Sequence, residues 1–308
     1  MFFYPSIVSN CYIWQMLKNY VALNKIVMKT IIKFLFLLIL LNPLSISAQQ
    51  QIKSTPAIKY GSNPKGRYIA TRGIKIYYET YGHGKPLLMI HGNGGSIENF
   101  KYQIPYFEKY YKVIAVDSRA QGKSIDTSST LNYEMMADDF NAILDSMHLD
   151  SVNVIGWSDG GINGLLLAIR HPEKVKKLAI TGANLIPDTT VFDPQVSFTA
   201  FLAPLLAAKQ DAATRNSIKL IRMMQVEPNI PLTDLHKIKC PVLVMGGDHD
   251  AIKPSHTLQI FENIPQAYLW ILPASGHATL QHYKNEFNTK VNYFFIHPYH
   301  KVKWDDWD

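Results

Sequence analysis

Short apolar runs alternate with segments of helical spacing along most of this chain. The runs at 85–92, 112–117 and 241–248 are almost continuously apolar, which is typical of strands buried on both faces of a sheet. Between such runs lie amphipathic segments, of which 132–147 is the clearest, with Asn132 as a candidate N-cap. Strands that alternate with helices predict an α/β fold: a doubly wound, mostly parallel sheet of about eight strands.

The alternation is interrupted between the predicted sixth and seventh strands. Residues 187–237 contain helical pieces near 196–209 and 211–225, together with several prolines. An insertion at this place predicts a small helical lid over the carboxyl ends of the strands. The core of the fold is then formed by 67–186 and 238–298, and a tail follows at 299–308.

The first 48 residues have the layout of a secretory signal peptide. Two lysines precede an apolar run at 34–41, and small residues end at Ala48. The run is too short to span a bilayer comfortably. We therefore predict cleavage after Ala48, a start of translation at Met28 with 1–27 upstream of it, and an exported protein, periplasmic or secreted. An uncleaved anchor, which would be the chain's only link to a membrane, is the open alternative.

Without the leader, the charge and the cysteines exclude several function classes. The leader holds 4 of the 31 basic residues and no acidic one, so the rest has 27 basic against 24 acidic residues, a net charge of +3. That small excess does not favour nucleic-acid binding. Cys240 is the one cysteine beyond a polar linker at 49–66, so no disulfide can form within the mature chain. The histidines lack ligand spacing, and we predict no metal site.

Four predicted strands are followed by loops with chemically useful residues. These loops read "HGNGG" (91–95), "GWSDGG" (156–161), "GGDHD" (246–250) and "SGH" (275–277). The carboxyl ends of parallel strands meet at one edge of the sheet, so the four loops should converge. Hydrolysis by a serine needs a base, a carboxylate that holds the base, and donors for the developing oxyanion. All three kinds of group are available in these loops.

The ordered set of these loops, with "DSRAQGKS" between the first two, resembles the α/β-hydrolase superfamily from about Arg67 to Phe295. The resemblance implies that Ser158 is the nucleophile and His277 the general base. Two acids are candidates for the third position. The family pattern G-x-x-D-x-x-x-P selects Asp250, and Asp248 is then expected to hydrogen-bond the backbone of its own turn.

The same resemblance indicates which residues form the oxyanion hole, and it bears on two loops near the site. The backbone N–H groups of Asn93 and Asp159 are the implied donors, helped by the partial positive charge where a helix begins. His91 is expected to shape its loop through backbone hydrogen bonds. The chain departs from its relatives at Ala120 and Gln121, where Gly-His is common, and we expect this to affect the shape of the pocket.

In this fold the nucleophile lies at a sharp turn between a strand and a helix, the nucleophile elbow. A serine at this position distinguishes the chain from dehalogenases and epoxide hydrolases of the same fold, which carry aspartate there. It implies a carboxylic-ester hydrolase that uses no cofactor and acts on a small-molecule ester. "GWSDGG" followed by "GAN" is also similar to the valacyclovir hydrolase (biphenyl hydrolase-like) branch. In that branch the acid after the nucleophile is associated with the amino group of the substrate, and Asp159 occupies that position. Offsetting the helix dipole is the alternative role for Asp159.

Side chains near the elbow and in the lid are candidates for the substrate pocket. They are Trp157, Phe198, Phe201, Met223 and Met224, and packing of the lid onto the body is the alternative role for the lid residues. Two other functions remain open: a carbon–carbon bond hydrolase, lyase or perhydrolase that uses the same triad, and a non-catalytic ligand receptor. The sequence says nothing about the oligomeric state.

Overall fold

The computed structural model describes residues 59–302. The predicted signal peptide, the alternative anchor and most of the 49–66 linker lie outside this range, as does most of the tail, and these features stay predictions. Within the described range, no helix has both the length and the apolar character needed to cross a membrane.

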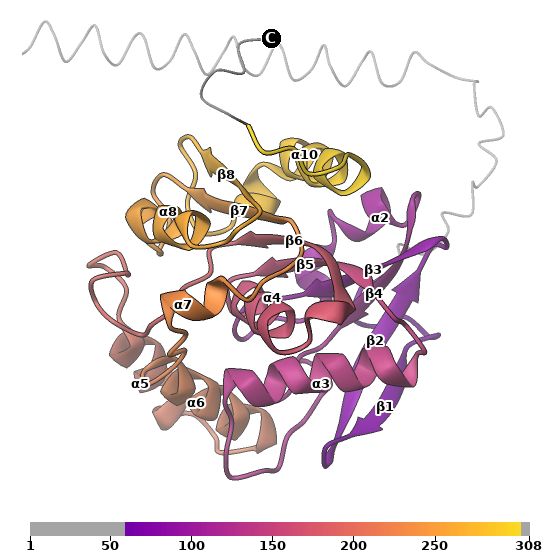
Figure 1. Ribbon diagram of the computed structural model, residues 1–308. Coiled ribbons are helices and arrows are strands. Elements are labelled where there is room, and N and C mark those ends of the chain that lie inside the picture. The colour runs from indigo at the N-terminus through magenta and orange to yellow at the C-terminus, as the bar shows by residue number, and fades with distance from the viewer. Residues whose placement is uncertain (1–58, 303–308) are drawn as a thin grey trace, which may run out of the picture. The chain divides into compact units, whose positions relative to one another are not determined.

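The centre of the molecule is a twisted sheet of eight strands in the order β1-β2-β4-β3-β5-β6-β7-β8 (Figure 1). β2 pairs in antiparallel fashion with β1 and β4, and all the other pairs are parallel. The predicted α/β fold with a mostly parallel sheet is confirmed. The strand bounds are Arg67–Thr71 (β1), Ile74–Tyr81 (β2), Lys85–Ile90 (β3), Tyr111–Val116 (β4), Val152–Trp157 (β5), Val175–Thr181 (β6), Val242–Gly247 (β7) and Ala267–Leu272 (β8).

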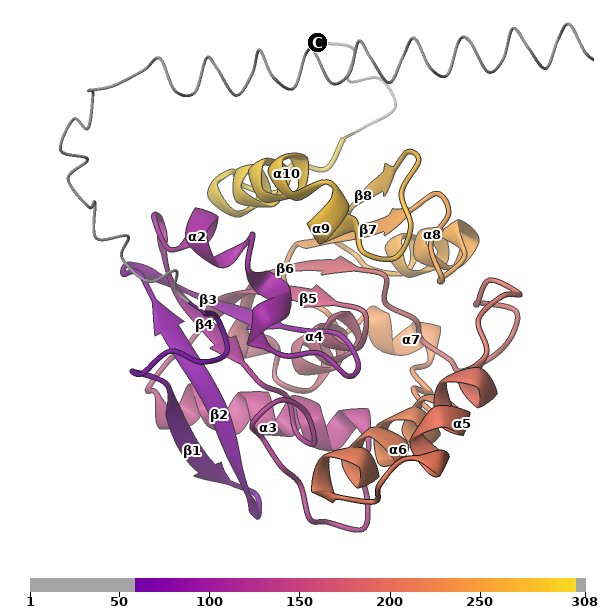
Figure 2. The ribbon, with the colours of Figure 1, turned by 180° about the vertical axis from the view of Figure 1, so that it is seen from behind.

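Both faces of the sheet are covered by helices. Side chains alternate between the faces along each strand: in β3, Leu88 and Ile90 belong to one core cluster, and Leu87 and Met89 to the other. One group of helices covers the first face: α3 (Tyr133–Ser146), α4 (Asp159–Arg170), α7 (Leu232–Leu235) and α8 (Pro254–Glu262). A second group covers the other: η1 (Ile97–Phe100), α2 (Ile104–Phe107), α9 (Thr279–His282) and α10 (Lys284–Ile296), as Figure 2 shows. The short η2 (Pro172–Lys174) leads into β6.

Two helical segments of the chain are interrupted. The first forms two short helices, η1 and α2, because Pro105 at the start of α2 lacks the N–H group that a continuous helix would use. The second is divided at Tyr283 into α9 and α10. β2 is half-buried and pairs with β1 on its outer side.

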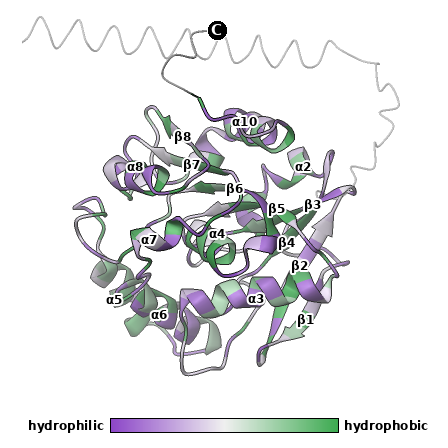
Figure 3. Ribbon diagram, viewed as in Figure 1, coloured by the Kyte–Doolittle hydropathy of each residue, from purple (hydrophilic) through white to green (hydrophobic). Residues whose placement is uncertain are grey.

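Between β6 and β7 the chain forms α5 (Phe198–Ala207) and α6 (Ala212–Met224) and then returns through α7. Figure 3 shows α5 as strongly hydrophobic, although none of its residues is buried. The end of the segment predicted as lid behaves differently: Ile230 and Leu235 are buried in the main core. α6 also packs on the body, because its Leu220 and Met223 belong to the main core, so of the two helices only α5 has no buried residue.

Candidate active site

Ser158 lies at a sharp turn between β5 and α4. Its backbone has φ 56° and ψ −120°, a conformation that is costly for any residue with a side chain and is usually found at functional sites. The turn is possible because its neighbours are glycines. A Cβ atom on Gly160 would lie 1.9 Å from the carbonyl oxygen of Ile90, and one on Gly156 would lie 2.2 Å from the carbonyl oxygen of Gly160. The close packing of β3 against this turn holds Ser158 at the end of the sheet.

The structure brings Ser158, His277 and Asp250 into one chain of hydrogen bonds. His277 follows β8 and Asp250 follows β7. The Ser158 Oγ is 2.9 Å from His277 Nε2, and His277 Nδ1 is 2.6 Å from Asp250 Oδ1. With the ring proton on Nδ1, this nitrogen donates to Asp250 and Nε2 accepts from the serine hydroxyl. Such an arrangement can take the proton of the serine as its oxygen attacks.

The two candidate acids have different surroundings. Asp250 is 3% exposed, and its carboxylate also accepts hydrogen bonds from the backbone N–H groups of Gly247 and Ile252. Asp248 does not contact the His277 ring. Its oxygens accept from the N–H groups of Ala274 and Ser275, each at 2.9 Å. Asp248 therefore stabilises the loop that carries His277. The hydrogen bond from His249 and the two backbone hydrogen bonds hold the pKa of Asp248 well below the usual range.

Two further residues position His277, and no motif in the sequence indicated either role. The indole N–H of Trp157 donates to the His277 carbonyl oxygen at 2.9 Å, so Trp157 fixes the loop as well as lining the pocket. Gly182, directly after β6, has φ 66°, and a Cβ atom there would lie 2.8 Å from the His277 ring. A side chain at position 182 would push the imidazole out of place.

The predicted oxyanion donors lie beside Ser158. A Cβ atom on Gly92 would lie 3.1 Å from the Ser158 Cβ, which shows how closely the loop after β3 approaches the nucleophile. Among residues 59–302, the backbone N–H groups of Asn93 and Asp159 donate to no acceptor. The Asp159 N–H is at the start of α4, where the helix dipole is positive. These donors are free to bind an oxyanion.

His91 joins two loops behind the site. Its Nδ1 donates to the Gly92 carbonyl oxygen at 2.8 Å, and its Nε2 accepts from the Ser118 N–H at 3.0 Å. Complete burial lowers the pKa of the imidazole, which keeps it neutral for these two bonds. The "DSRAQGKS" loop thus supports His91, and its residues are not among those that line the pocket. The expectation that the departure from the family affects the shape of the pocket is therefore wrong. Ala120 takes the left-handed φ of 66° that glycine has more easily.

A pocket of about 510 Å³ opens over Ser158, a size suited to a small organic molecule. Phe198 and Phe201 from α5 and Met224 from α6 line it, as predicted. Met223 is the exception: it is 4% exposed and packs in the main core instead. Consecutive helical residues point about 100° apart, so only one of the two methionines can face the pocket.

Asp159 lies in the pocket wall and is 2% exposed. Its Oδ2 accepts from the side chain of Asn93 at 2.9 Å, and the Tyr133 hydroxyl also hydrogen-bonds this carboxyl group. Burial raises the pKa of Asp159 to about 6, although these two bonds and the nearby His277 oppose the shift. The carboxyl group is therefore buried in the pocket wall and does not lie on the outer surface. Tyr133 is a residue that the sequence did not single out.

Known proteins share this fold and its motifs. The family model of the alpha/beta hydrolase fold matches residues 85–217. The human serine hydrolase BPHL is 26% identical over 256 residues, which is 77% of this chain and 88% of that protein. An esterase from Exiguobacterium antarcticum has a TM-score of 0.64 at 25% identity, covering 74% of this chain and 98% of its own. A meta-cleavage product hydrolase from Pseudomonas fluorescens has a TM-score of 0.62 at 22% identity over 75% of this chain and 97% of its own.

The fold and the hydrogen-bonded serine, histidine and aspartate define a hydrolase of α/β type. This chain has the α/β-hydrolase fold.

Proposed function

We propose that this protein is a serine hydrolase that cleaves a small carboxylic ester through an acyl-enzyme intermediate. The observation that carries the proposal is the continuous chain from Asp250 through His277 to Ser158 at the mouth of an apolar pocket. Two backbone N–H groups that donate to no acceptor within 59–302 lie beside the same serine. The name of the human relative, a serine hydrolase, and that of the bacterial esterase support this class of reaction.

Acylation follows from the geometry. As Ser158 Oγ attacks the ester carbonyl carbon, His277 Nε2 takes the hydroxyl proton, and Asp250 stabilises the imidazolium that forms. The N–H groups of Asn93 and Asp159 bind the negative oxygen of the tetrahedral intermediate. The intermediate collapses, the carbon–oxygen bond to the alcohol breaks, and His277 gives its proton to the departing alkoxide.

Deacylation reverses these roles with water as the nucleophile. His277 Nε2 takes a proton from water while the water oxygen attacks the acyl carbon, and the same proton then returns to Ser158 Oγ as the carboxylic acid leaves. No redox step is needed. Every proton that moves is held by His277.

An ester panel tests the reaction class. We expect the full chain to hydrolyse p-nitrophenyl acetate and butyrate with a burst of one p-nitrophenolate per active site, since the activated leaving group makes acylation faster than deacylation. Failure to turn over any ester, together with cleavage of a carbon–carbon bond in a vinylogous diketone, would replace the ester proposal. Binding of these compounds without turnover would indicate a receptor.

Within this function, we infer that Asp159 favours esters with an ammonium group near the carbonyl. The buried carboxylate lies in the pocket wall one residue from the nucleophile, and a charge pair gains more there than in water. Asn93 and Tyr133 fix its orientation. Asp159→Asn should lower kcat/KM for an α-aminoacyl ester about tenfold or more and leave a neutral ester of the same size nearly unchanged.

The pH dependence gives a second test of Asp159. Below its pKa of about 6 the carboxyl is neutral and cannot pair with ammonium, so the ratio of kcat/KM for aminoacyl over neutral ester should rise as pH increases through 6. Any pH effect on the triad is common to both substrates and cancels in this ratio. Asp159→Asn should flatten the rise. Equal losses on both esters, or an unchanged ratio, would leave Asp159 with only a structural role.

A further inference from the structure

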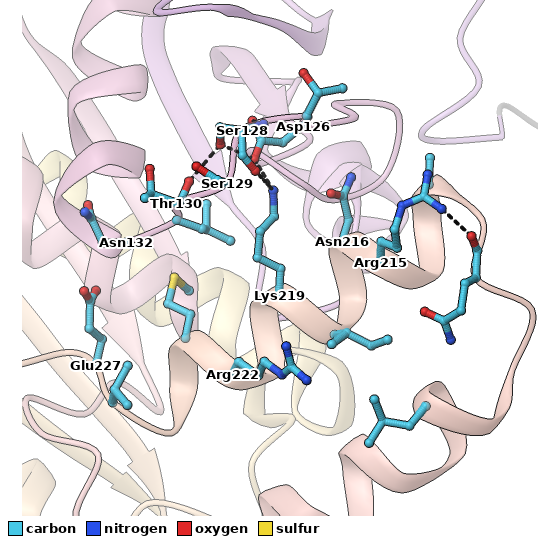
Figure 4. A pocket seen from close by; sticks show the side chains of 18 residues that line it. Asp126, Ser128, Ser129, Thr130, Asn132, Arg215, Asn216, Lys219, Arg222 and Glu227 are labelled. Carbon is cyan, nitrogen blue, oxygen red and sulfur yellow. Dashed lines mark hydrogen bonds and ion pairs between the residues drawn. The ribbon is translucent and has the colours of Figure 1, made fainter.

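A second cleft, of about 940 Å³, lies between residues 126–132 and α6 (Figure 4). It is separate from the pocket over Ser158, because α6 forms a wall between the two. Ser217, Ile221 and Met224 line the pocket, whereas Lys219 and Arg222 line the cleft. A molecule bound in the cleft would contact the lid without touching the triad.

Part of the charge in this cleft is already paired. Asp126 is 6% exposed and lies between two cations, with Arg119 Nη1 at 3.0 Å on the body side and Lys219 Nζ on the lid side. Lys219 also donates to the Ser128 carbonyl oxygen at 2.9 Å, as the dashed lines in Figure 4 indicate. The side-chain amide of Asn216 faces the backbone of Asp126 as well. These contacts tie α6 to the 126–132 segment and neutralise Lys219.

Arg222 also lines the cleft and, unlike Lys219, is not paired with an acid within 59–302. It is exposed in the cleft, and its guanidinium makes no hydrogen bond or ion pair with any residue in 59–302. Arg215 is partly engaged, because it donates to the Gln210 carbonyl oxygen. Glu227 also lines the cleft; it has no ion pair within 59–302, and its carboxylate accepts from the backbone N–H of Tyr133. Two arginines against one carboxylate leave the cleft with an excess of one positive charge.

The opposite wall supplies neutral donors and the floor is apolar. Asn132 uses its Oδ1 to cap α3, so its amide N–H₂ group remains free within 59–302. The hydroxyls of Ser129 and Thr130 also line the cleft. The exposed side chains of Leu206 and Val226 add apolar surface to the cleft. A guanidinium that is open to bidentate bonding, beside hydroxyl and amide donors and an apolar wall, matches a carboxylate attached to a short hydrocarbon chain.

We propose that this cleft binds a small organic monoanion, a carboxylate with an apolar tail, anchored on Arg222. The single excess positive charge favours a monoanion over a dianion. The bound acid would bridge α6 and the 126–132 segment, adding to the contact that Lys219 and Asp126 already make. The proposal uses none of the catalytic residues and stands whether or not the protein is an esterase.

Calorimetric titration of the full chain with hexanoate tests the site. We expect saturable binding that weakens as ionic strength rises, and a loss of affinity of tenfold or more in Arg222→Gln. Arg222→Lys should recover part of the affinity, since it keeps the charge but not the bidentate geometry. Lys209→Gln, which removes an exposed cation between α5 and α6, is the matched control and should bind within twofold of the original chain.

Two further arms separate this site from the catalytic pocket. Met224→Trp fills the pocket on the opposite face of α6 and should leave hexanoate binding unchanged in a variant that melts cooperatively. Loss of binding in Met224→Trp with retention in Arg222→Gln would place the acid over Ser158 and overturn the proposal. Equal binding of hexanol, or no binding of hexanoate at all, would overturn it as well.

Discussion

Ser158→Ala and His277→Ala should each lower kcat/KM for a reactive ester by ~10³-fold or more, while the melting temperature stays close to that of the original chain. The alanine at 158 removes the atom that attacks, and the alanine at 277 removes the imidazole nitrogen, 2.9 Å away, that takes its proton. Steady-state kinetics with p-nitrophenyl butyrate and a thermal melt measure the two effects.

The double variant gives a sharper result than either single one. Because the serine and the histidine act as one unit, Ser158→Ala combined with His277→Ala should lose little more activity than Ser158→Ala alone. Losses that multiply would mean that the two side chains act independently, and the proposed mechanism would be wrong.

The choice of acid has its own control in the neighbouring residue. Asp250→Asn should be severely impaired, because the amide cannot stabilise an imidazolium and can hold the ring in the wrong tautomer. Asp248→Asn keeps one oxygen for the N–H groups of Ala274 and Ser275 and should change kcat only a few-fold. The reverse order of severity would assign the third catalytic position to Asp248.

The parts of the site that could be predicted from sequence lie directly after buried strands. Ser158, Asp250 and His277 each follow an apolar run, and parallel strands bring such positions to one edge. The order of the motifs along the chain then indicates which residue is the nucleophile, which the acid and which the general base. The same logic predicted the sheet and the place of α5 and α6, since both depend on apolar periodicity along the chain.

The parts that could not be predicted depend on contacts across the fold or on a rotation of a few tens of degrees. Tyr133 looks like an ordinary core residue of an amphipathic helix, and only packing of α3 against α4 brings its hydroxyl to Asp159. Met223 and Met224 have the same chemistry, and the rotational setting of α6 decides which one faces the pocket. The position of Arg222 in a cleft could not be predicted either. The sequence does not show whether an arginine on a helix lines a cleft without a partner or lies on the open surface.

Gly160→Ala should destabilise the protein by about 3 kcal/mol. The added methyl group would lie 1.9 Å from the carbonyl oxygen of Ile90 and 2.8 Å from that of His91, and both are backbone atoms that cannot rotate away. Relief requires α4 to move from β3, which breaks the packing that holds the turn at Ser158. Urea denaturation should show a lower midpoint with an unchanged m value, since the surface exposed on unfolding stays the same.

Gly276→Ala is the matched control for this prediction, because it adds the same methyl group beside the histidine. The nearest atom to the new Cβ would be the His249 carbonyl oxygen at 3.7 Å, an ordinary contact, so the free energy of unfolding should change by less than about 1 kcal/mol. If Gly160→Ala were as stable as Gly276→Ala, α4 would not be pressed against β3, and the strained turn at Ser158 would need another cause. If it were destabilised as expected, residual activity of the folded fraction would show how far Ser158 had moved from His277.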